Sequence, residues 1–236
     1  MDKPLTTLFM LMSLDGKIST GCVDERDVDK DFPKIVGIRE GLHQYYEIEQ
    51  RTDLFSMNSG RVVAKVGINN PQEGVQKTPV SFIIIDNKPH LTERGVVNFL
   101  KKSKTLFIVT TNKSHPAYRT SESENLEIIY FEDKIDFTNL FHKLKCDFNI
   151  QRMTLQTGGT LNSILLREKL IDKISLVIAP ALIGGKDTAT VIDGISLQSL
   201  HELDKIKALR LVNVVTFEDS YLQLNYDVIN ETRLIT

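Results

Sequence analysis

The stretch Arg152–Gly185, RMTLQTGGTLNSILLREKLIDKISLVIAPALIGG, decides how we read the fold of this chain. It begins with a β-rich run at Met153–Thr157, passes through two glycines, and continues from Thr160 with apolar residues at helical spacing. A second apolar run, Ile174–Ala179, follows shortly after the expected helix. The stretch therefore predicts a strand, a glycine turn, a helix and a second strand, the unit that builds a parallel or mixed sheet.

The glycine pair Gly158-Gly159 has two interpretations. Glycine lets another group approach the backbone closely, and the N–H groups and dipole at a helix start favour an anion. A phosphate site is therefore one interpretation of this turn. A tight turn without any ligand explains the same two residues, so the choice depends on other parts of the chain.

Length and composition favour one large soluble domain spanning residues 1–236. The 236 residues are 41% hydrophobic and 25% charged, and the net charge of −2 comes from basic and acidic residues that are interspersed. This pattern favours neither a nucleic acid nor an anionic membrane as partner. No run approaches the roughly 18 apolar residues of a spanning helix, and the N-terminus lacks the order of a cleavable signal. We expect a cytoplasmic protein.

The cysteines and histidines indicate no metal site. Cys22 and Cys146 are far apart and outside any C-x-x-C pattern, so we expect free thiols. The five histidines show no spacing that would bring two ligands to one zinc ion. A hydrolase of the G-x-S-x-G type is also excluded, because the sequence lacks that motif.

The first apolar run, Leu5–Met12, predicts a buried strand that is followed by the turn sequence S-L-D-G-K-I. Asp-Gly is common in turns that have no function. Polar groups just beyond a buried strand are, however, where open α/β sheets hold ligands. We therefore expect four residues to line a site: Ser13, Asp15, Lys17 and Ser19.

The rest of the chain alternates between apolar runs of strand length and segments with helical spacing. We expect strands at Asp53–Met57, Val80–Asp86, Thr105–Val109 and Leu126–Phe131, and helices at Gly37–Gln50, Val62–Val66, Thr92–Lys102 and Phe137–Leu144. The polar stretch Cys22–Lys34 is expected to be a loop, either a functional lid or a plain surface loop. Leu209–Phe217 and Tyr221–Val228 predict an antiparallel hairpin, the second run by its alternation. The fold class is thus α/β, with a mixed, mostly parallel sheet, an antiparallel C-terminal hairpin and helices on both faces.

Two further turns carry candidate ligand groups. Asn58-Ser59-Gly60-Arg61 lies between a strand and a helix and suits a phosphate or the edge of a cofactor, although helix capping by Asn58 or Ser59 explains the same residues. Lys88 and Thr110 lie beyond strand ends, where they suit the ribose or 2′-phosphate of a dinucleotide or are ordinary surface residues.

In combination, these motifs resemble the reductase domain of riboflavin biosynthesis, which has the dihydrofolate reductase-like fold. The resemblance rests on S-L-D-G-K-I at Ser13–Ile18, the strand and turn at Asp53–Arg61, T-G-G-T-L-N at Thr157–Asn162, and L-I-D-K-I-S-L-V-I-A-P-A-L-I-G-G at Leu170–Gly185. The order of elements matches from about Thr6 to Val228.

The resemblance implies reduction by NADPH of 5-amino-6-(5-phosphoribosylamino)uracil, with hydride transfer to C1′ of the opened ribose. It also implies a homodimer, by family analogy. The implied catalytic residues, facing nicotinamide and substrate, are Asp15 and Ser13. The implied cofactor residues are Gly158, Gly159, Thr160 and Leu161 at the pyrophosphate, Ser59, Gly60 and Arg61 at the second turn, and Lys88 and Thr110 toward the adenosine end. The implied substrate residues are Lys17, Ser19 and Gln156.

The sequence also departs from the family pattern. Gln156 stands where the family usually has glutamate, and the turn at 58–61 lacks the first glycine and the threonine of G-x-G-T. No arginine near Glu49 corresponds to the one expected to bind the substrate phosphate, and no zinc deaminase module is present, so another protein would carry out any upstream deamination. Two alternatives stay open: a dihydrofolate reductase-like enzyme that acts on another pterin or heterocycle, and a non-catalytic nucleotide-binding protein of the same fold. For the enzymatic reading, a bulky β-branched residue at Gly159 is expected to weaken NADPH binding while folding is largely kept.

Overall fold

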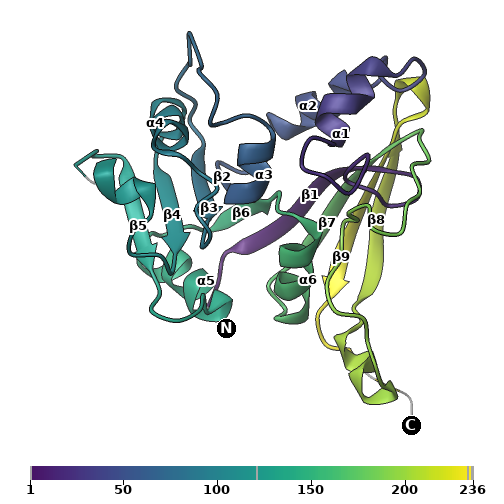
Figure 1. Ribbon diagram of the computed structural model, residues 1–236. Helices are drawn as coiled ribbons and strands as arrows, with labels where there is room; N and C mark the ends of the chain where they lie inside the picture. The colour runs from purple at the N-terminus through teal and green to yellow at the C-terminus, as the bar shows by residue number, and fades with distance from the viewer. Residues whose placement is uncertain (1, 121, 233, 235–236) are drawn as a thin grey trace. The chain divides into compact units, whose positions relative to one another are not determined.

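The computed structural model describes residues 2–120, 122–232 and 234, which group into two compact units (Figure 1). The first unit is Asp53–Thr157 with the residues that precede Leu5. The second is Leu5–Thr52 with the chain from Gly158 onward. The chain therefore leaves the second unit at Thr52 and returns to it at Gly158. The expectation of a single domain over residues 1–236 stays a prediction.

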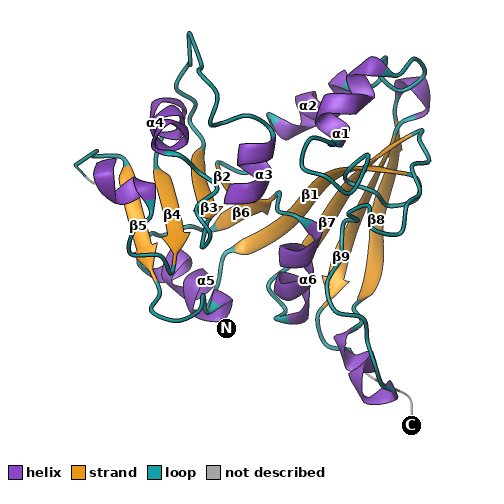
Figure 2. Ribbon diagram, viewed as in Figure 1, coloured by secondary structure: helices purple, strands orange, loops and turns teal. Residues whose placement is uncertain are grey.

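The first unit contains a parallel sheet in the strand order β5-β4-β3-β2-β6, with a helix after several of its strands (Figure 2). Its strands are β2 (Phe55–Ser59), β3 (Ser81–Ile85), β4 (Leu106–Thr110), β5 (Leu126–Tyr130) and β6 (Arg152–Leu155). Its helices are α3 (Gly60–Lys65), α4 (Glu93–Lys102) and α5 (Phe137–Cys146), and a 3-10 helix covers Pro116–Thr120.

Local sequence explains why the α4 segment forms a helix and which face it buries. The Thr92 side chain accepts the N–H of Gly95, which satisfies one of the free donors of the first turn. Val96 and Phe99 lie three residues apart on one side of α4 and are buried against Ile84 and Ile108 of the sheet. All five residues of β4 are buried, which explains the apolar run Leu106–Val109 that precedes its last residue, Thr110.

The second unit combines a parallel strand pair with two antiparallel pairs in the order β1-β7-β9-β8. Its strands are β1 (Leu5–Ser13), β7 (Lys173–Ala179), β8 (Ala208–Thr216) and β9 (Leu222–Ile229). Its α-helices are α1 (Val28–Asp31), α2 (His43–Glu49) and α6 (Gly159–Arg167). Three 3-10 helices cover Phe32–Lys34, Leu200–Lys205 and Glu218–Ser220.

Aromatic side chains join α2 to the sheet of the second unit. The ring of Tyr45 stacks on that of Phe9 in β1, with centroids 5.1 Å apart. Tyr221 is fully buried in the same cluster, and its hydroxyl donates a hydrogen bond to the Ile38 carbonyl at 2.7 Å. A buried tyrosine needs such an acceptor, so Tyr221 fixes the segment before α2 as well as filling the core.

The expected fold class is confirmed: the protein is α/β, its strands are mostly parallel, and the C-terminal strands are antiparallel. Two local predictions were wrong. The helix expected at Gly37–Gln50 begins only at His43, because Gly37 has φ +89° and Gly41 packs against the Tyr221 ring. The loop expected at Cys22–Lys34 contains α1, because the Asp27 side chain caps a helix by accepting the N–H of Asp29.

Candidate functional site

In the second unit, the S-L-D-G-K turn that follows β1 is bound to the loop that follows β7. The Asp15 carboxylate accepts the Ser13 hydroxyl at 2.5 Å and the main-chain N–H groups of Ile183 and Gly184 at 3.1 and 2.6 Å. The Lys17 ammonium group donates to the carbonyls of Gly185 and Thr188 at 2.8 and 2.9 Å. Two sequence motifs about 170 residues apart therefore form one structure.

Asp15 remains ionised at neutral pH. The Ser13 hydroxyl and the Gly184 N–H, which both donate to the carboxylate, lower the pKa of Asp15 from 3.8 to about 2. A carboxylate in that state accepts hydrogen bonds but has no proton to donate. The turn can therefore fix a donor group of a ligand, whereas Asp15 does not fit the role of a general acid.

The α6 helix begins at the glycine turn, and one side of that turn is closed. Gly159 is buried, and a Cβ at this residue would overlap the Thr190 carbonyl and the Asp193 carboxylate. Asp193 in turn accepts the N–H and hydroxyl of Thr190 and donates its own N–H to the Gly159 carbonyl at 3.0 Å. The lack of a side chain at Gly159 is thus explained by the packed 190–193 segment.

The other side of the α6 start faces solvent. Thr160 is exposed, Leu161 is half-buried, and Gly158 at the N-cap provides no side-chain hydrogen bond. Helix N-termini without a side-chain cap retain N–H donors that suit an anion. A diphosphate therefore fits this exposed side of the turn and does not fit the buried side of Gly159.

Our expectation that Gly159 tolerates a bulky β-branched residue without loss of folding is wrong. The overlap would be with a main-chain carbonyl, which cannot move away as the end of a flexible side chain can. The effect of such a substitution on NADPH binding would therefore be confounded by misfolding.

Two predicted ligand residues are buried and already bonded, so the structure does not support ligand contact by them. The Ser19 hydroxyl lies within hydrogen-bond distance of the carbonyls of Gly21 and Arg26, at 2.9 and 2.8 Å. The Thr110 hydroxyl donates to the Asp86 carbonyl at 2.9 Å and accepts the N–H of Asn112 at 3.1 Å. Both hydroxyls hold loops in place, which is the common role of serine and threonine beside strand ends.

In the first unit, β2 continues directly into α3. The Ser59 side chain caps α3 by accepting the N–H of Val62 at 3.3 Å. Gly60 is buried, and a Cβ at this residue would overlap the Asp86 carboxylate. Arg61 and Lys88 are exposed. The helix capping that was one interpretation of the 58–61 turn is therefore observed, with Ser59 as the cap. Arg61 and Lys88 add positive charge to the ends of β2 and β3.

Gln156 lies just past β6 in the first unit and is half-buried. Its side-chain oxygen accepts the Ser56 hydroxyl at 3.0 Å, and that hydroxyl oxygen accepts the Asn58 amide at 3.0 Å. The residue at the position of the expected glutamate is thus part of a polar chain that runs along β2.

A buried cluster at the end of β3 was not predicted from the sequence. Asp86 and His115 are at most 1% exposed, and Asp86 accepts hydrogen bonds from His115 and His90. The available signal was an acidic residue directly after the apolar run V-S-F-I-I-I. The two histidines gave no signal, because they lie far from each other in sequence.

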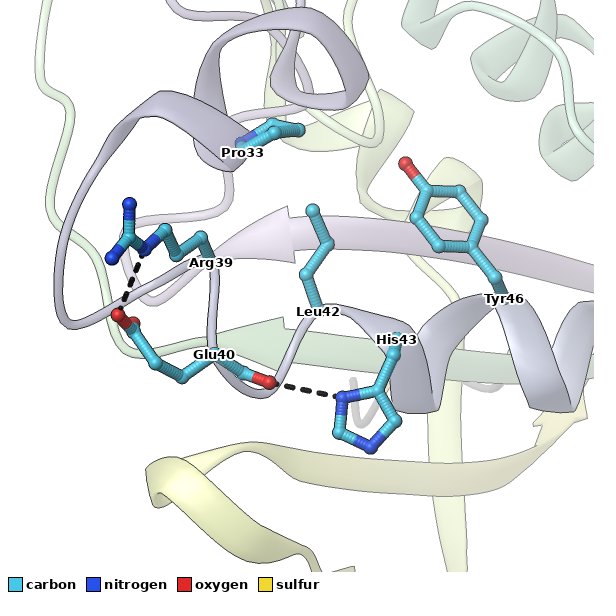
Figure 3. Close-up of a pocket in the computed structure, with 6 residues that line it drawn as sticks. All are labelled: Pro33, Arg39, Glu40, Leu42, His43 and Tyr46. Carbon is cyan, nitrogen blue, oxygen red and sulfur yellow. Dashed lines mark hydrogen bonds and ion pairs between the residues drawn. The ribbon is translucent and has the colours of Figure 1, made fainter.

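The second unit also has a shallow hollow of about 530 Å³, shown in Figure 3. Pro33, Leu42 and Tyr46 form its apolar side, whereas Arg39, Glu40 and His43 form its polar side. The lining contains none of the predicted site residues. The described residues contain no group of three or more metal-ligating side chains and no helix long and apolar enough to span a membrane.

The hydroxyl of Tyr46, which lines this hollow, donates a hydrogen bond to the Asp29 carboxylate at 3.1 Å. Burial, followed by the negative charge of Asp27, raises the pKa of Asp29 from 3.8 to about 6.

Comparison with known proteins identifies the family. Residues 4–222 match the model of the RibD C-terminal domain. The chain belongs to this family of riboflavin-pathway pyrimidine reductases, which are oxidoreductases that typically use NAD(P)H.

The relatives are distant. A 2,5-diamino-6-ribosylamino-4(3H)-pyrimidinone 5′-phosphate reductase of Methanothermobacter thermautotrophicus is 23% identical over 217 residues, which cover 88% of this chain and 92% of that one. The enzyme of the same name from Archaeoglobus fulgidus is 23% identical over 220 residues, which cover 88% of this chain and 94% of that one.

Solved structures show the same fold. RibD of Acinetobacter baumannii superposes with a TM-score of 0.67 at 15% identity, covering 96% of this chain but only 58% of that chain. The riboflavin biosynthesis reductase Rib7 of Saccharomyces cerevisiae gives a TM-score of 0.60 at 18% identity, covering 97% of this chain and 91% of that chain.

Proposed function

We propose that this protein is an NADPH-dependent reductase that transfers a hydride to C1′ of the opened ribose of 5-amino-6-(5-phosphoribosylamino)uracil. The observation that carries the proposal is the structure formed by the S-L-D-G-K turn and the 181–188 loop, which Asp15 and Lys17 hold together. It presents polar groups beyond the ends of β1 and β7, where α/β proteins hold ligands. Family membership over residues 4–222 supports the same reading.

Each residue has a defined part in this proposal. NADPH would supply the hydride, and the protein would align the reactants and exclude water. In the second unit, the exposed start of α6 at Gly158, Thr160 and Leu161 would hold the diphosphate. In the first unit, Arg61 and Lys88 would contribute positive charge toward the phosphates.

The ionised Asp15 would accept a hydrogen bond from the substrate. A carboxylate offers about four acceptor positions, three of which are taken by Ser13, Ile183 and Gly184. Ser13 would orient Asp15, because its hydroxyl donates to that carboxylate and accepts the Lys17 N–H at 3.0 Å.

Gln156 favours the uracil form of the substrate. The full-length relatives are named for a 2,5-diamino pyrimidinone, which has an exocyclic amino group where uracil has a carbonyl. An amide side chain can donate a hydrogen bond to that carbonyl, whereas the ionised glutamate usual in the family can only accept hydrogen bonds, from the amino group or from a ring N–H. A change of glutamate to Gln156 is therefore expected to shift preference toward uracil.

The decisive experiment is a rate comparison on defined substrates. Purified protein is mixed with NADPH and with the uracil substrate, its 2,5-diamino counterpart or dihydrofolate, and loss of the reduced-nicotinamide absorbance is followed. A higher kcat/KM for the uracil compound than for its diamino counterpart, with no oxidation of NADPH by dihydrofolate, supports the proposal, and Gln156→Glu should shift the ratio of kcat/KM toward the diamino compound.

Two other outcomes would replace the proposal. Turnover of dihydrofolate alone would favour a reductase of another heterocycle. Thermal stabilisation by NADPH without oxidation on any substrate would favour a non-catalytic nucleotide-binding protein, and absence of stabilisation by either NADPH or NADH would remove both nucleotide proposals.

We also propose that the protein forms a homodimer through β8. In the described part of the chain, β8 pairs with β9 on one side only, so its outer edge has unpaired main-chain groups. Leu209, Leu211 and Val214 share a face of the sheet with half-buried residues of β9 and are 43%, 51% and 49% exposed. An apolar edge strand of this kind is a favourable surface for another chain.

Charge along β8 favours a second copy as that chain. Basic residues lie at its start, with Lys207 and Arg210, and acidic residues follow its end, with Glu218 and Asp219. Antiparallel pairing of two copies about the middle of β8 brings the basic start of one strand toward the acidic end of the other. Such a surface is self-complementary, as a twofold interface requires.

A further inference from the structure

The carboxylate of Asp86 is a buried anion at the end of β3 that takes no part in the reaction proposed above. It is 1% exposed and lies in the first unit, at the carboxyl end of the parallel sheet. We propose that Asp86 is a positioning residue that, with His90 and His115, fixes the NADPH contacts of this unit. The proposal rests on the proposed function and concerns the affinity for NADPH.

Asp86 gathers donors from two loops. Its carboxylate accepts the main-chain N–H of His90 at 3.0 and 3.1 Å, the N–H of Leu91 at 3.0 Å, and the His90 ring nitrogen Nδ1 at 3.0 Å. Nε2 of His115, in the loop after β4, completes the set at 3.1 Å. Every one of these groups donates to an ionised carboxylate, and hydrogen bonds of this kind are among the stronger ones in proteins.

The hydrogen bonds fix the tautomer of His115. Its Nδ1 accepts the main-chain N–H of Ala117 at 3.1 Å, so that nitrogen carries no proton. The proton of a neutral ring is therefore on Nε2, which donates to Asp86. Burial acts to raise the pKa of Asp86, but the hydrogen bonds from His115, His90 and Leu91 outweigh it and lower the pKa overall.

The same carboxylate supports the elements that carry the proposed cofactor residues. Gly60, the first residue of α3, packs so closely on Asp86 that a Cβ would overlap its carboxylate. The segment from Asp86 to Leu91 includes Lys88 and is closed by the His90 and Leu91 bonds. The Thr110 hydroxyl binds the Asp86 carbonyl, which joins the end of β4 to the same point.

Loss of the Asp86 charge should therefore displace Arg61 and Lys88 without removing either side chain. Asparagine is nearly the same size as aspartate, but its NH2 group would face an N–H group that in the wild type donates a hydrogen bond to a carboxylate oxygen. Asp86→Asn removes one or two charge-assisted hydrogen bonds that hold Arg61 and Lys88 in place for the cofactor. We therefore expect NADPH binding to weaken by about 10- to 100-fold.

The test compares matched variants by NADPH titration and by steady-state kinetics. Asp86→Asn should raise the Kd and KM for NADPH by about 10- to 100-fold, while kcat at saturating NADPH changes by less than about twofold. Asp53→Asn is the control, because Asp53 is a partly buried carboxylate of the same unit, bound to Arg152 at 3.0 Å near the opposite end of β2. It should leave NADPH affinity unchanged.

His90→Ala keeps the inference falsifiable if Asp86→Asn does not fold. The His90 ring is 38% exposed, and its removal deletes one hydrogen bond to Asp86 while the main-chain bonds stay. It should raise the Kd for NADPH about 3- to 10-fold. Nitrogen NMR shifts of His115 provide a readout that needs no cofactor: wild type should show the tautomer protonated on Nε2.

Four results would overturn the inference. Unchanged NADPH affinity in both variants, or a loss of stability and kcat with no change in Kd, would show that Asp86 only holds the fold. His115 protonated on Nδ1 would contradict the hydrogen-bond network. A wild-type protein that binds no NADPH would overturn both this inference and the proposed function. The other results would overturn the inference alone, so the two cases can be distinguished.

Discussion

The carboxylate of Asp15 accepts the main-chain N–H of Gly184 at 2.6 Å, so one side chain joins the loop after β1 to the loop after β7. The N–H of Ile183 donates to Oδ1 of the same carboxylate at 3.1 Å, whereas the N–H of Gly184 donates to Oδ2. Asp15 accepts hydrogen bonds from two consecutive N–H groups and so holds the second loop in place; we call this set of hydrogen bonds the Asp15 staple. The fold favours the ionised form of Asp15.

We predict that this staple is lost at acid pH. The pKa of Asp15 is lowered from 3.8 to about 2 in the folded protein, so its contribution to stability is complete above about pH 4 and disappears as the pH falls toward 2. Asp15→Asn should therefore be less stable than wild type at neutral pH, with the difference shrinking below about pH 4. Thermal unfolding at several pH values measures this, and a difference independent of pH would contradict it.

The fate of Gly159 gives a second prediction. Gly159→Val should destabilise the protein by about 1–3 kcal/mol or more, because its side chain would overlap the Thr190 carbonyl and the Asp193 carboxylate. Thr160→Val is the matched control, since Thr160 is the next residue and is exposed. Denaturant unfolding of both variants measures the effect, and equal stability would show that the 190–193 segment does not pack against the turn.

Strand positions could be predicted from sequence because buried strands need continuous apolar residues. The run Val80–Asp86 predicted β3, observed at Ser81–Ile85, and the C-terminal hairpin followed from its alternation. The helix before β2 was predicted to begin too early. Gly37 has a positive φ, and Gly41 makes room for Tyr221, a residue far away in the sequence that helical spacing cannot reveal.

Part of the candidate site could also be predicted from the sequence, because the ends of the apolar runs locate the ends of the strands. Strand ends located Ser13, Asp15 and Lys17, but their partners in the 183–188 loop lie about 170 residues away and depend on the pairing of β1 with β7. Serine and threonine in loops and at strand ends look alike in a sequence whether they bind ligands or main-chain carbonyls, so the burial of Ser19 and Thr110 could not be predicted.

The third prediction tests the exposed start of α6 with an added charge. Thr160→Asp should weaken NADPH binding about tenfold by repelling the diphosphate, whereas the helix dipole keeps or slightly raises stability. Thr138→Asp is the control, because Thr138 is likewise the exposed second residue of its helix, α5. NADPH titration and thermal unfolding measure the two effects. Equal weakening by both variants would indicate a general charge effect and no site at α6.

The fourth prediction concerns Asp29 beside Tyr46. Its pKa is raised to about 6, so the folded protein binds more protons than the unfolded chain between about pH 4 and 6, and stability falls as the pH rises through that range. Asp29→Asn removes this penalty and still accepts the Tyr46 hydroxyl. It should stabilise the protein by about 1–2 kcal/mol at neutral pH and by little below about pH 4. Denaturant unfolding at both pH values measures this, and destabilisation at neutral pH would show that the charged form is the favoured one.

The fifth prediction tests the homodimer and its surface together. Leu211 is 51% exposed in β8, so Leu211→Glu should fold normally, yet it would place a charge in the apolar interface and convert the dimer to a monomer. Leu54→Glu is the control, because Leu54 is 57% exposed and lies before β2 in the first unit. Light scattering after size-exclusion chromatography measures the mass of each species.

Charge reversal then tests the direction of pairing. Lys207→Glu alone should weaken the dimer, because it places a negative charge toward the acidic end of the facing β8, and adding Glu218→Lys should restore it. Restoration by the double variant requires antiparallel pairing, since parallel copies would place Lys207 beside its own equivalent. A monomeric wild-type protein at all accessible concentrations, or a dimer that survives Leu211→Glu, would show that β8 is not the interface.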